Sequence, residues 1–114
     1  MAKTIRAYLV EITVASGSGS VQITDDEFRP ISDAGGYIAQ ILVQAPSPDT
    51  PDTFVTFDIE IVDSDGFIVY DKIGSEDHIN DTTRIPVKGD YDINIDKATK
   101  DGTYKLKLIH EEEW

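Results

Sequence analysis

The stretch Thr53–Asp71, TFVTFDIEIVDSDGFIVYD, predicts two β-strands joined by one tight acidic turn. Apolar and polar residues alternate along its first half, which gives a strand one dry face and one wet face. The segment Asp63–Gly66 then supplies side chains that hydrogen-bond to their own backbone and a glycine that accepts positive φ. We therefore place the centre of the fold at this hairpin, whose apolar face carries Val55, Phe57, Ile59 and Ile61.

The return strand of this hairpin begins with Phe67–Tyr70, which is apolar at consecutive positions. Strands that are buried on both faces carry continuous apolar runs of this kind. We therefore expect this segment to be covered on both faces, or to pack against a neighbouring molecule.

Six other segments show strand patterns and bring the expected number of strands to about eight. Tyr37–Gln44 is strongly apolar, which predicts an interior position in a sheet, with Ile38, Gln40 and Leu42 on one face. Pro86 has no backbone N–H, so it predicts a strand at a sheet edge or the end of a strand. The six segments are Thr4–Val14, Val21–Thr24, Tyr37–Gln44, Thr82–Val87, Tyr91–Asp96 and Tyr104–Leu108.

The segments between these strands have small, polar or proline-rich sequences, which are typical of loops. Ala15–Ser20, ASGSGS, has no large side chain and predicts a flexible hairpin loop. Ala45–Asp52, APSPDTPD, holds three of the five prolines and predicts an extended connection that reaches beyond the domain. The other predicted loops are Ser32–Gly36, the acidic Gly74–Asp81 and Lys97–Gly102.

The predicted fold class is all-β, because no segment shows a convincing helical period of 3.6 residues. Short strands separated by loops indicate an antiparallel β-sandwich, either Ig-like or jelly-roll-like, in which two packed sheets bury the alternating apolar faces. A length of 114 residues predicts a single domain over residues 1–114. We expect Glu111–Trp114 to form a flexible tail or an anchor for a neighbour.

The composition narrows the classes of partner. The chain has no cysteine, so it can form neither a disulfide framework nor a thiolate metal site. Its first residues lack the continuous apolar segment of a signal peptide, and no stretch approaches the roughly 20 apolar residues of a membrane helix. The 22 acidic and 10 basic residues give a net charge of −12, which argues against phosphate binding. We expect neither a nucleic-acid nor a membrane partner.

The charge is unevenly distributed along the chain. Asp49–Asp81 contains ten acidic residues against the single basic residue Lys72. The acidic outer row of Tyr91–Asp96 and the lysine row of Tyr104–Leu108 are expected to pair across a hairpin. Two interpretations of the negative charge remain open. It keeps a β protein soluble and its edges apart, or it recognises a basic surface on a partner or a sister subunit.

The clusters of acidic residues do not predict a metal site or a catalytic pair. Glu60, Asp63, Asp65 and Asp71 offer the carboxylates that calcium prefers, but their spacing does not fit an EF-hand loop and a turn explains it equally well. Asp58 shares a strand face with Glu60, and nothing in the sequence marks a cleft around them. We expect no metal and no cofactor.

The two histidines do not predict catalysis either. His78 lies near Ser75 in the sequence, but a base and a nucleophile must meet in space and face an oxyanion site. His110 has no such neighbour. We therefore assign no catalytic residue and expect that the protein is not an enzyme.

Three segments in the second half carry a family resemblance. They are Val62–Val69, with a strand, a DSDG turn and a return strand, Thr82–Gly89, TTRIPVKG, and Asp101–Leu108, DGTYKLKL. With this arrangement, the chain from Phe54 to His110 resembles small β-sandwich proteins encoded beside the head genes of tailed bacteriophages. The resemblance transfers no catalytic residue.

The resemblance implies a non-enzymatic virion protein, most specifically a capsid decoration or cement protein that stabilises the head. Its implied partners are the major capsid protein or other virion proteins, and further copies of itself as an oligomer. The implied location is the virion, assembled in the host cytoplasm. Two alternatives remain open: an acidic β module that binds carbohydrate or protein in the cell, and an acidic inhibitor that mimics nucleic acid.

Overall fold

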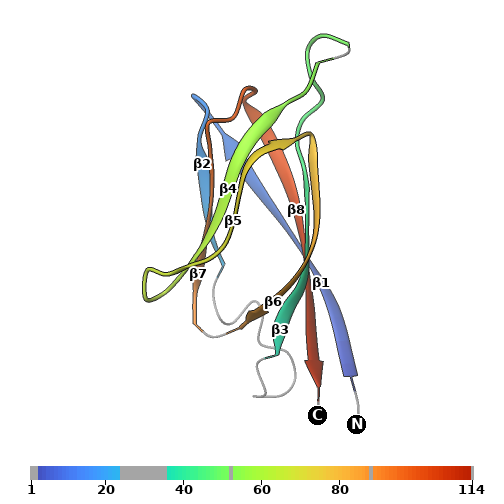
Figure 1. The fold of residues 1–114 in the computed structure, drawn as a ribbon, viewed down its shortest axis with the longest axis vertical. Helices are drawn as coiled ribbons and strands as arrows, with labels where there is room; N and C mark the ends of the chain where they lie inside the picture. The colour runs from blue at the N-terminus through green and yellow to red at the C-terminus, as the bar shows by residue number, and fades with distance from the viewer. Residues whose placement is uncertain (1–2, 24–35, 52, 88, 114) are drawn as a thin grey trace.

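The computed structural model describes residues 3–23, 36–51, 53–87 and 89–113, which form eight strands in two sheets (Figure 1). The strands are β1 (Lys3–Val14), β2 (Gly19–Ile23), β3 (Tyr37–Gln44), β4 (Thr56–Asp63), β5 (Ile68–Glu76), β6 (His78–Pro86), β7 (Tyr91–Asp96) and β8 (Gly102–Glu113). One antiparallel sheet has the order β1-β8-β3-β6 and the other has the order β2-β7-β4-β5. The predicted all-β antiparallel sandwich is confirmed.

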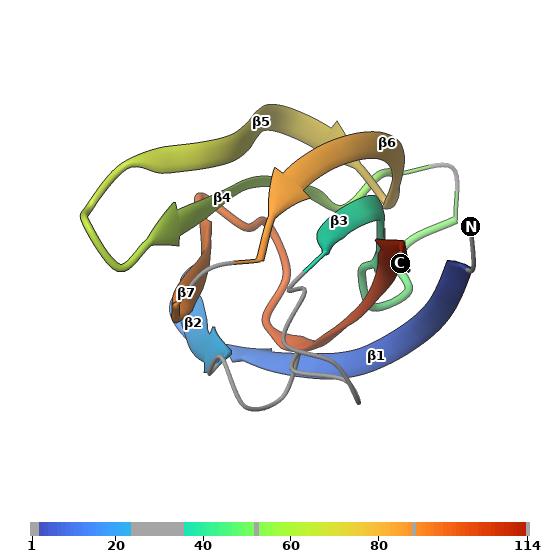
Figure 2. The same cartoon turned by 90° about the horizontal axis from the view of Figure 1, so that it is seen from below.

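Most strands pair with partners that are distant in the sequence. β1 pairs with β8, β2 with β7, β3 with β6, and β4 with β5. The chain is therefore doubled back at the β4–β5 turn, and the doubled ribbon is rolled into the two layers seen in Figure 2. This strand order is that of a jelly roll, since an Ig-like sandwich would pair its first two strands directly. The hairpin at the predicted centre is the turning point of the whole ribbon.

The hydrophobic core lies between the two sheets and is supplied by the inward residues of the strands. The rings of Phe57 on β4 and Tyr104 on β8 meet edge to face across this core, with centroids 5.3 Å apart. Such a pair contributes about 0.5–1.5 kcal/mol beyond the burial of its area. The Tyr104 hydroxyl donates a hydrogen bond of 2.7 Å to the Lys100 carbonyl, so the buried ring leaves no polar atom unsatisfied.

The predicted flexible loop Ala15–Ser20 is shorter and more constrained than expected. The turn closes with a hydrogen bond of 3.0 Å from the Ala15 N–H to the Ser18 carbonyl, and β2 begins at Gly19. A Cβ at Gly19 would lie 2.3 Å from the Thr13 carbonyl oxygen, so the backbones approach too closely for a side chain. Ala15 and Ser18 thus form the antiparallel pair of a tight hairpin turn, and its two arms continue into different sheets.

The prediction of an acidic loop at Gly74–Asp81 is wrong, because two strands run through this segment. Between them, the single residue Asp77, at φ 59°, turns the chain from one sheet to the other. The backbone of Asp77 bonds to Val55 and Ala45 at 2.8 Å each, and its carboxylate accepts the Val55 N–H at 2.9 Å. Long-range hydrogen bonds therefore override the turn-like local composition.

β3 lies between β8 and β6, so its predicted interior position is confirmed. Its predicted faces are wrong at one residue. The register shifts between Ile38 and Gln40, and Ile38 is buried together with Ile41 and Val43. A β-bulge adds one residue to a strand and reverses the alternation beyond it, so Ile38 and Leu42 point to different sides.

β5 and β6 are edge strands of the two sheets. Phe67 and Ile68 are exposed, so the prediction that Phe67–Tyr70 is covered on both faces is wrong within the chain. Contact of this segment with a neighbouring molecule stays a prediction. β6 ends at Pro86 on a sheet edge, as its missing N–H predicts.

The predicted tail at residues 111–114 is also corrected where the structure describes it. β8 continues through Glu113, and Glu112 is buried, because the long β1 strand pairs with β8 as far as Lys3. Trp114 and most of the predicted loop Ser32–Gly36 lie outside the described residues. The described ranges contain no helix that is long and apolar enough to cross a membrane.

Candidate functional site

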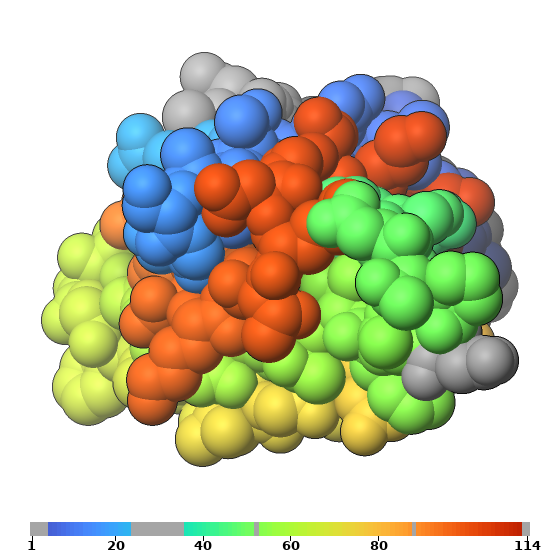
Figure 3. Space-filling view, turned by 90° about the horizontal axis from the view of Figure 1, so that it is seen from above, coloured from blue at the N-terminus to red at the C-terminus, as the bar shows by residue number. Residues whose placement is uncertain are grey.

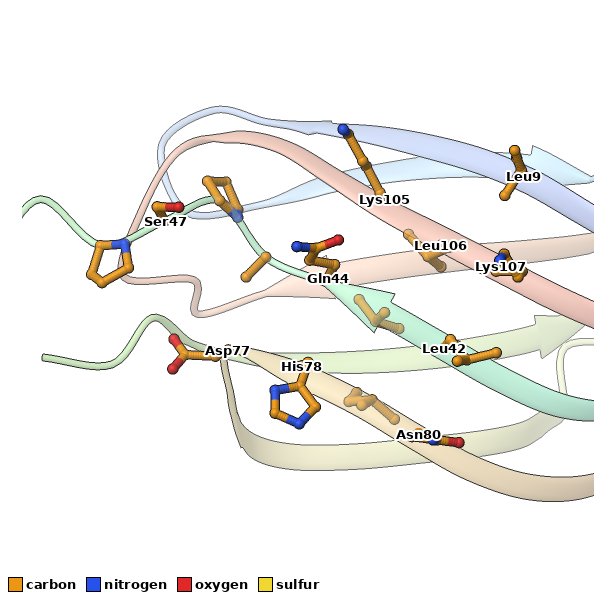
Figure 4. Close-up of a pocket in the computed structure, with 15 residues that line it drawn as sticks. Leu9, Leu42, Gln44, Ser47, Asp77, His78, Asn80, Lys105, Leu106 and Lys107 are labelled. Carbon is orange, nitrogen blue, oxygen red and sulfur yellow. The ribbon is translucent and has the colours of Figure 1, made fainter.

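A groove lies on the outer face of the β1-β8-β3-β6 sheet, at the end where β3 runs into the proline-rich segment (Figure 4). Its volume is about 620 Å³. β1, β3, β6 and β8 supply its floor and walls, and the segment Ala45–Pro48 forms its rim. The lining residues are Leu9, Leu42, Val43, Gln44, Ala45, Pro46, Ser47, Pro48, Asp77, His78, Ile79, Asn80, Lys105, Leu106 and Lys107.

Strand register places apolar and basic side chains side by side in this groove. One row across the sheet runs from Leu9 on β1 through Lys107 on β8 and Leu42 on β3 to Asn80 on β6. Side chains at paired positions of neighbouring strands point to the same face of a sheet. Two leucines therefore flank one lysine on an outer face. Figure 4 shows these four side chains crossing the sheet.

Lys105 occupies the next row, between Glu11 on β1 and Gln44 on β3. Lys105 and Lys107 are both exposed, and within the described residues neither forms an ion pair. The groove thus presents two ammonium groups beside exposed apolar surface. This combination suits a ligand that carries both apolar and acidic groups.

The rim of the groove is attached to the body of the sandwich. The Ala45 N–H donates to the Asp77 carbonyl at 2.8 Å, and Asp49 forms an ion pair with Lys100. Pro46 lies close to Gly102, where a Cβ would come within 3.1 Å of the proline ring. These contacts position the start of Ala45–Asp52, the segment for which the sequence predicts an extended connection.

The outer face of the other sheet is acidic. Asp58 on β4 lies opposite Asp96 on β7, and Glu60 lies opposite Asn94. Asp58 accepts the Gly74 N–H at 2.8 Å, and Asn94 donates to Glu60 at 3.2 Å. The predicted common face of Asp58 and Glu60 is confirmed, and the carboxylates lie on a different sheet from the groove lysines.

The predicted pairing of acidic and lysine rows across a hairpin is wrong. Tyr91–Asp96 forms β7 and Tyr104–Leu108 belongs to β8, which lie in different sheets and do not pair. The reversal Lys97–Gly102 carries the chain from one sheet to the other. As a result, Lys107 lies opposite leucines on both neighbouring strands, and Lys105 lies opposite Glu11 on β1 and Gln44 on β3.

A polar cluster connects β5 to β6, the edge strands of the two sheets. The Tyr70 hydroxyl donates to Asp81 at 2.6 Å, and the Lys72 ammonium lies 3.1 Å from the same carboxylate. Burial, with the bond to Asp81, raises the pKa of Tyr70 above the usual phenol value. The Tyr70 hydrogen bond, and then Lys72, lower the pKa of Asp81. These shifts favour a neutral phenol and an ionised carboxylate, which form a stable link between the two strands.

The two histidines lie in different environments. The His78 ring is exposed at the groove, whereas His110 is buried with its ring centroid 6.2 Å from that of Tyr8. Ser75 is buried, so its hydroxyl does not share a surface with His78. The structure therefore does not bring these residues together as a nucleophile and a base.

The carboxylates that were considered as a calcium site lie in the β4–β5 turn and on the two strands that it joins. Asp63 accepts N–H groups from Asp65 at 3.0 Å and Phe67 at 2.8 Å, which builds the β4–β5 turn. Glu60 and Asp71 face each other across the β4–β5 pair. In the part of the chain that the structure describes, no group of three or more histidine or acidic side chains is placed to hold a metal ion.

Comparisons with known proteins support the architecture. No family model matches the chain, and no curated protein matches its sequence. The chain is similar in fold to the dimeric latent PorU from Porphyromonas gingivalis, at a TM-score of 0.50 and 6% identity, covering 96% of this chain and 13% of that one. It therefore spans a small part of that protein. The likeness shows a shared fold and assigns no activity.

Two other solved structures are similar to this chain at lower TM-scores. A CBM4 structure aligns at a TM-score of 0.44 and 11% identity, covering 91% of this chain and 71% of that one. The enzymatically active domain of tailspike protein 4 from bacteriophage CBA120 aligns at 0.38 and 11% identity, covering 97% and 19%. Neither likeness assigns a role to this chain.

The sequence pattern predicts the lysine row of β8 but does not predict the groove. Lys105 and Lys107 were predicted on an outer face, which is confirmed, but their neighbours depend on pairing with β1 and β3. The available signal was Leu9, an apolar residue on a polar strand face. Leu42 is also apolar on an outer face, but the bulge in β3 interrupts the alternation, so the pattern groups Leu42 with the buried Ile38.

Proposed function

We propose that this chain is a non-enzymatic structural protein of a phage virion, most specifically a decoration or cement protein that stabilises the capsid. The observation that supports this role is the distribution of large apolar side chains over separate surfaces. Two lie on β1, two on β5, one at the β4–β5 turn and one before β4. They are Ile5, Leu9, Ile68, Ile73, Phe67 and Phe54.

The positions of these residues favour several contacts rather than one binding site. β1 and β5 are edge strands, so their exposed apolar side chains lie beside unpaired backbone groups. A small monomer gains little from exposing such edges, whereas a repeated lattice can cover them on several sides. The proposed partners are the major capsid protein or other virion proteins, and further copies of this chain.

The family resemblance supports the same role. Its three segments correspond to the central turn, the end of β6 and the first part of β8. The proposed location is accordingly the virion, assembled in the host cytoplasm. The role requires no catalytic residue, cofactor, nucleic acid or membrane.

The test is co-sedimentation of the purified protein with assembled capsids that lack it. We expect saturable binding at a fixed number of copies per shell. The variants Ile5→Ser and Ile73→Ser each remove one exposed apolar side chain from an edge strand outside the groove. At least one of them should weaken binding, because tight attachment needs a buried area above roughly 1,000 Å² or many weak contacts together.

Thr82→Ser is the matched control, because it changes an exposed residue of the edge strand β6 and keeps its polarity. It should bind like the original protein. If the intact protein remains in the supernatant at micromolar concentration and is missing from virions, the decoration role is wrong.

The groove favours a second candidate, an acidic β-sandwich module that binds a protein ligand. Among the residues that the structure describes, its lining contains two lysines and exposed leucine but no tryptophan, tyrosine or phenylalanine. A peptide with acidic and apolar residues suits it better than a sugar ring, which needs an aromatic platform for stacking. Titration with such a peptide should shift the NMR signals of Leu9 and Lys107, and equal shifts with oligosaccharides would favour a carbohydrate ligand instead.

A further inference from the structure

The β4–β5 turn, residues 63–68, forms a finger with an apolar and acidic tip. Phe67 and Ile68 are 69% and 57% exposed, and Asp65 is exposed beside them. The carboxylate of Asp63 holds the finger in shape by accepting the N–H groups of Asp65 and Phe67. A tip that is already ordered loses less conformational entropy on binding than a flexible loop.

The groove offers the complementary properties. Leu9, which is 77% exposed, and Leu42 provide an apolar floor, and Lys105 and Lys107 provide positive charge. An aromatic and an aliphatic side chain can bury apolar surface on this floor while a carboxylate approaches an ammonium group. The groove volume of about 620 Å³ lies within the range of roughly 300–1,000 Å³ that is usual for binding pockets.

The finger and the groove lie on different sides of the molecule. The finger belongs to the β2-β7-β4-β5 sheet and the groove to the other sheet. In Figure 1 the β4–β5 turn projects at the lower left, whereas the proline-rich rim of the groove lies at the top. Figure 3 likewise shows the turn, in yellow-green, on the side away from the green rim segment. One copy therefore cannot place its own finger in its own groove.

We infer that the finger of one copy inserts into the groove of a second copy. The two surfaces are different, so the contact is heterologous, and each copy in a pair keeps one unused finger or groove. Repetition of the contact produces a ring or an open chain of copies. The inference deepens the proposed function and rests on it for its biological setting, because a contact between neighbouring copies would connect decoration proteins across a shell.

The first test is sedimentation equilibrium of the purified protein at increasing concentration. A single finger in a groove is a small interface, so the measurement should extend to about 1 mM, where contacts at the weak end of the range are detected. We expect association that grows with concentration and weakens at high salt, since part of it is electrostatic. Phe67→Ser and Lys107→Glu should each reduce it at least tenfold.

A mixing experiment distinguishes a heterologous contact from a symmetric one. The Phe67→Ser variant keeps an intact groove, and the Lys107→Glu variant keeps an intact finger. Each alone should associate at least tenfold more weakly than the original protein, but an equimolar mixture should form a dimer and nothing larger, because only one competent interface remains per pair. In a symmetric dimer with reciprocal contacts the mixture would also recover in part, but the original protein would then stop at a dimer, whereas a heterologous contact produces larger species.

Two matched variants control for the chemical changes. Thr103→Ser changes an exposed residue outside the finger and groove, and Lys97→Glu reverses an exposed charge elsewhere. Both should associate like the original protein, and thermal melts should show that all four variants fold. The inference is overturned if the original protein stays monomeric, if the mixture does not recover, or if the controls weaken association equally.

The outcome is independent of the capsid experiment. If self-association depends on Phe67 and Lys107 but the protein is absent from virions, then the contact between copies stands and the decoration role is wrong. The opposite result is also possible to recognise. If the protein binds shells but stays monomeric in solution up to the highest concentration, and the Phe67→Ser variant binds shells equally well, then the decoration role stands and this contact is wrong.

Discussion

Gly66 is required at the central turn by its backbone conformation rather than by lack of space. Its φ is 88°, and a Cβ added there would meet no atom within 4 Å. The Gly66 N–H donates to the Asp63 carbonyl at 3.1 Å, which closes the turn. Any loss of stability caused by a side chain at this position therefore comes from the positive φ alone.

Replacing Gly66 with valine should lower the free energy of unfolding by on the order of 1 kcal/mol or more, because a β-branched residue resists positive φ. Gly66→Asn is the matched variant, since asparagine tolerates this region of φ and ψ. We expect urea denaturation to show a clearly larger loss for valine than for asparagine. Equal stability of the glycine and valine proteins would contradict the turn.

Tyr70 and Asp81 link β5 to β6 through a hydrogen bond that depends on pH. The pKa of Tyr70 is raised, so its contribution to stability is present below the usual phenol pKa and is lost at higher pH. The pKa of Asp81 is lowered, so its contribution is present above the usual carboxyl pKa and is lost as the pH falls. The link therefore stabilises the fold at neutral pH.

The variant Tyr70→Phe should lose about 1 kcal/mol at neutral pH, the typical net value of a hydrogen bond, with a discount because Asp81 is partly exposed to solvent. The difference from the original protein should shrink as the pH falls below the usual carboxyl range, because the pKa of Asp81 is lowered in the folded protein. The measurement is urea denaturation at several pH values. A difference that is the same at pH 3 and pH 7 would show that only packing of the ring had changed.

At the scale of elements, the crossings between the sheets are positioned by side chains from distant strands. The Asp101 carboxylate, just before β8, accepts the N–H groups of Ser16 and Gly17 at 3.0 Å each. The Ala98 N–H donates to the Gly17 carbonyl at the same distance. These bonds join the β1–β2 turn to the β7–β8 turn and explain why a sequence typical of flexible loops adopts one conformation.

Asp101→Ala should destabilise the protein by about 1 kcal/mol and speed amide hydrogen exchange at Ser16 and Gly17, because two N–H groups lose their acceptor. Asp92→Ala is the control, since Asp92 is exposed on β7 and lies between Gln22 and Val62 in the register. Exchange at the turn should not change in the control. Faster exchange in both variants would point to a general loss of stability.

At the scale of the whole molecule, the rolled ribbon makes most pairings long-range. β1 pairs with β8 from Lys3 and Glu113 to Val14 and Gly102, whereas β4 and β5 are joined by one short turn. Chain closure costs more entropy for the first pair than for the second, and folds dominated by distant pairings fold slowly. We therefore expect the central hairpin to form before the terminal strands pair.

The variants Ile61→Val and Ile12→Val test this order, because each removes one methylene from a buried isoleucine, on β4 and β1 respectively. Each should cost about 0.5–1.5 kcal/mol at equilibrium. In stopped-flow experiments, Ile61→Val should mainly slow folding and Ile12→Val should mainly speed unfolding. The reverse assignment would mean that the termini pair first.

The charge distribution is also a property of the whole molecule. The sequence shows a net charge of −12, but the jelly-roll topology separates the acidic face of β4 and β7 from the lysines of β8. The groove lysines therefore lie on the opposite face of the sandwich from this acidic row. This polarity favours contacts between unlike surfaces, as the finger and the groove require.

Alternation and turn chemistry predict the number of strands, the central turn and the core residues of most strands, but not the full extent of β5 and β6. These features are local, because alternation of apolar and polar residues defines the two faces of a strand wherever that strand lies, as at Phe57, Ile59 and Ile61. The turn at Asp63–Gly66 is likewise specified by its own side chains and its glycine. An edge position for the strand of Pro86 followed from a missing N–H group.

Contacts between distant parts of the chain set which strands are neighbours, and the groove depends on that pairing. Alternation does not encode a pairing partner, so the sequence could not place Lys107 between Leu9 and Leu42, or separate β7 from β8. The corner at Asp77 and the bulge in β3 have the same origin. Hydrogen bonds and packing between residues far apart in the chain outweigh the local preferences that a sequence pattern reports.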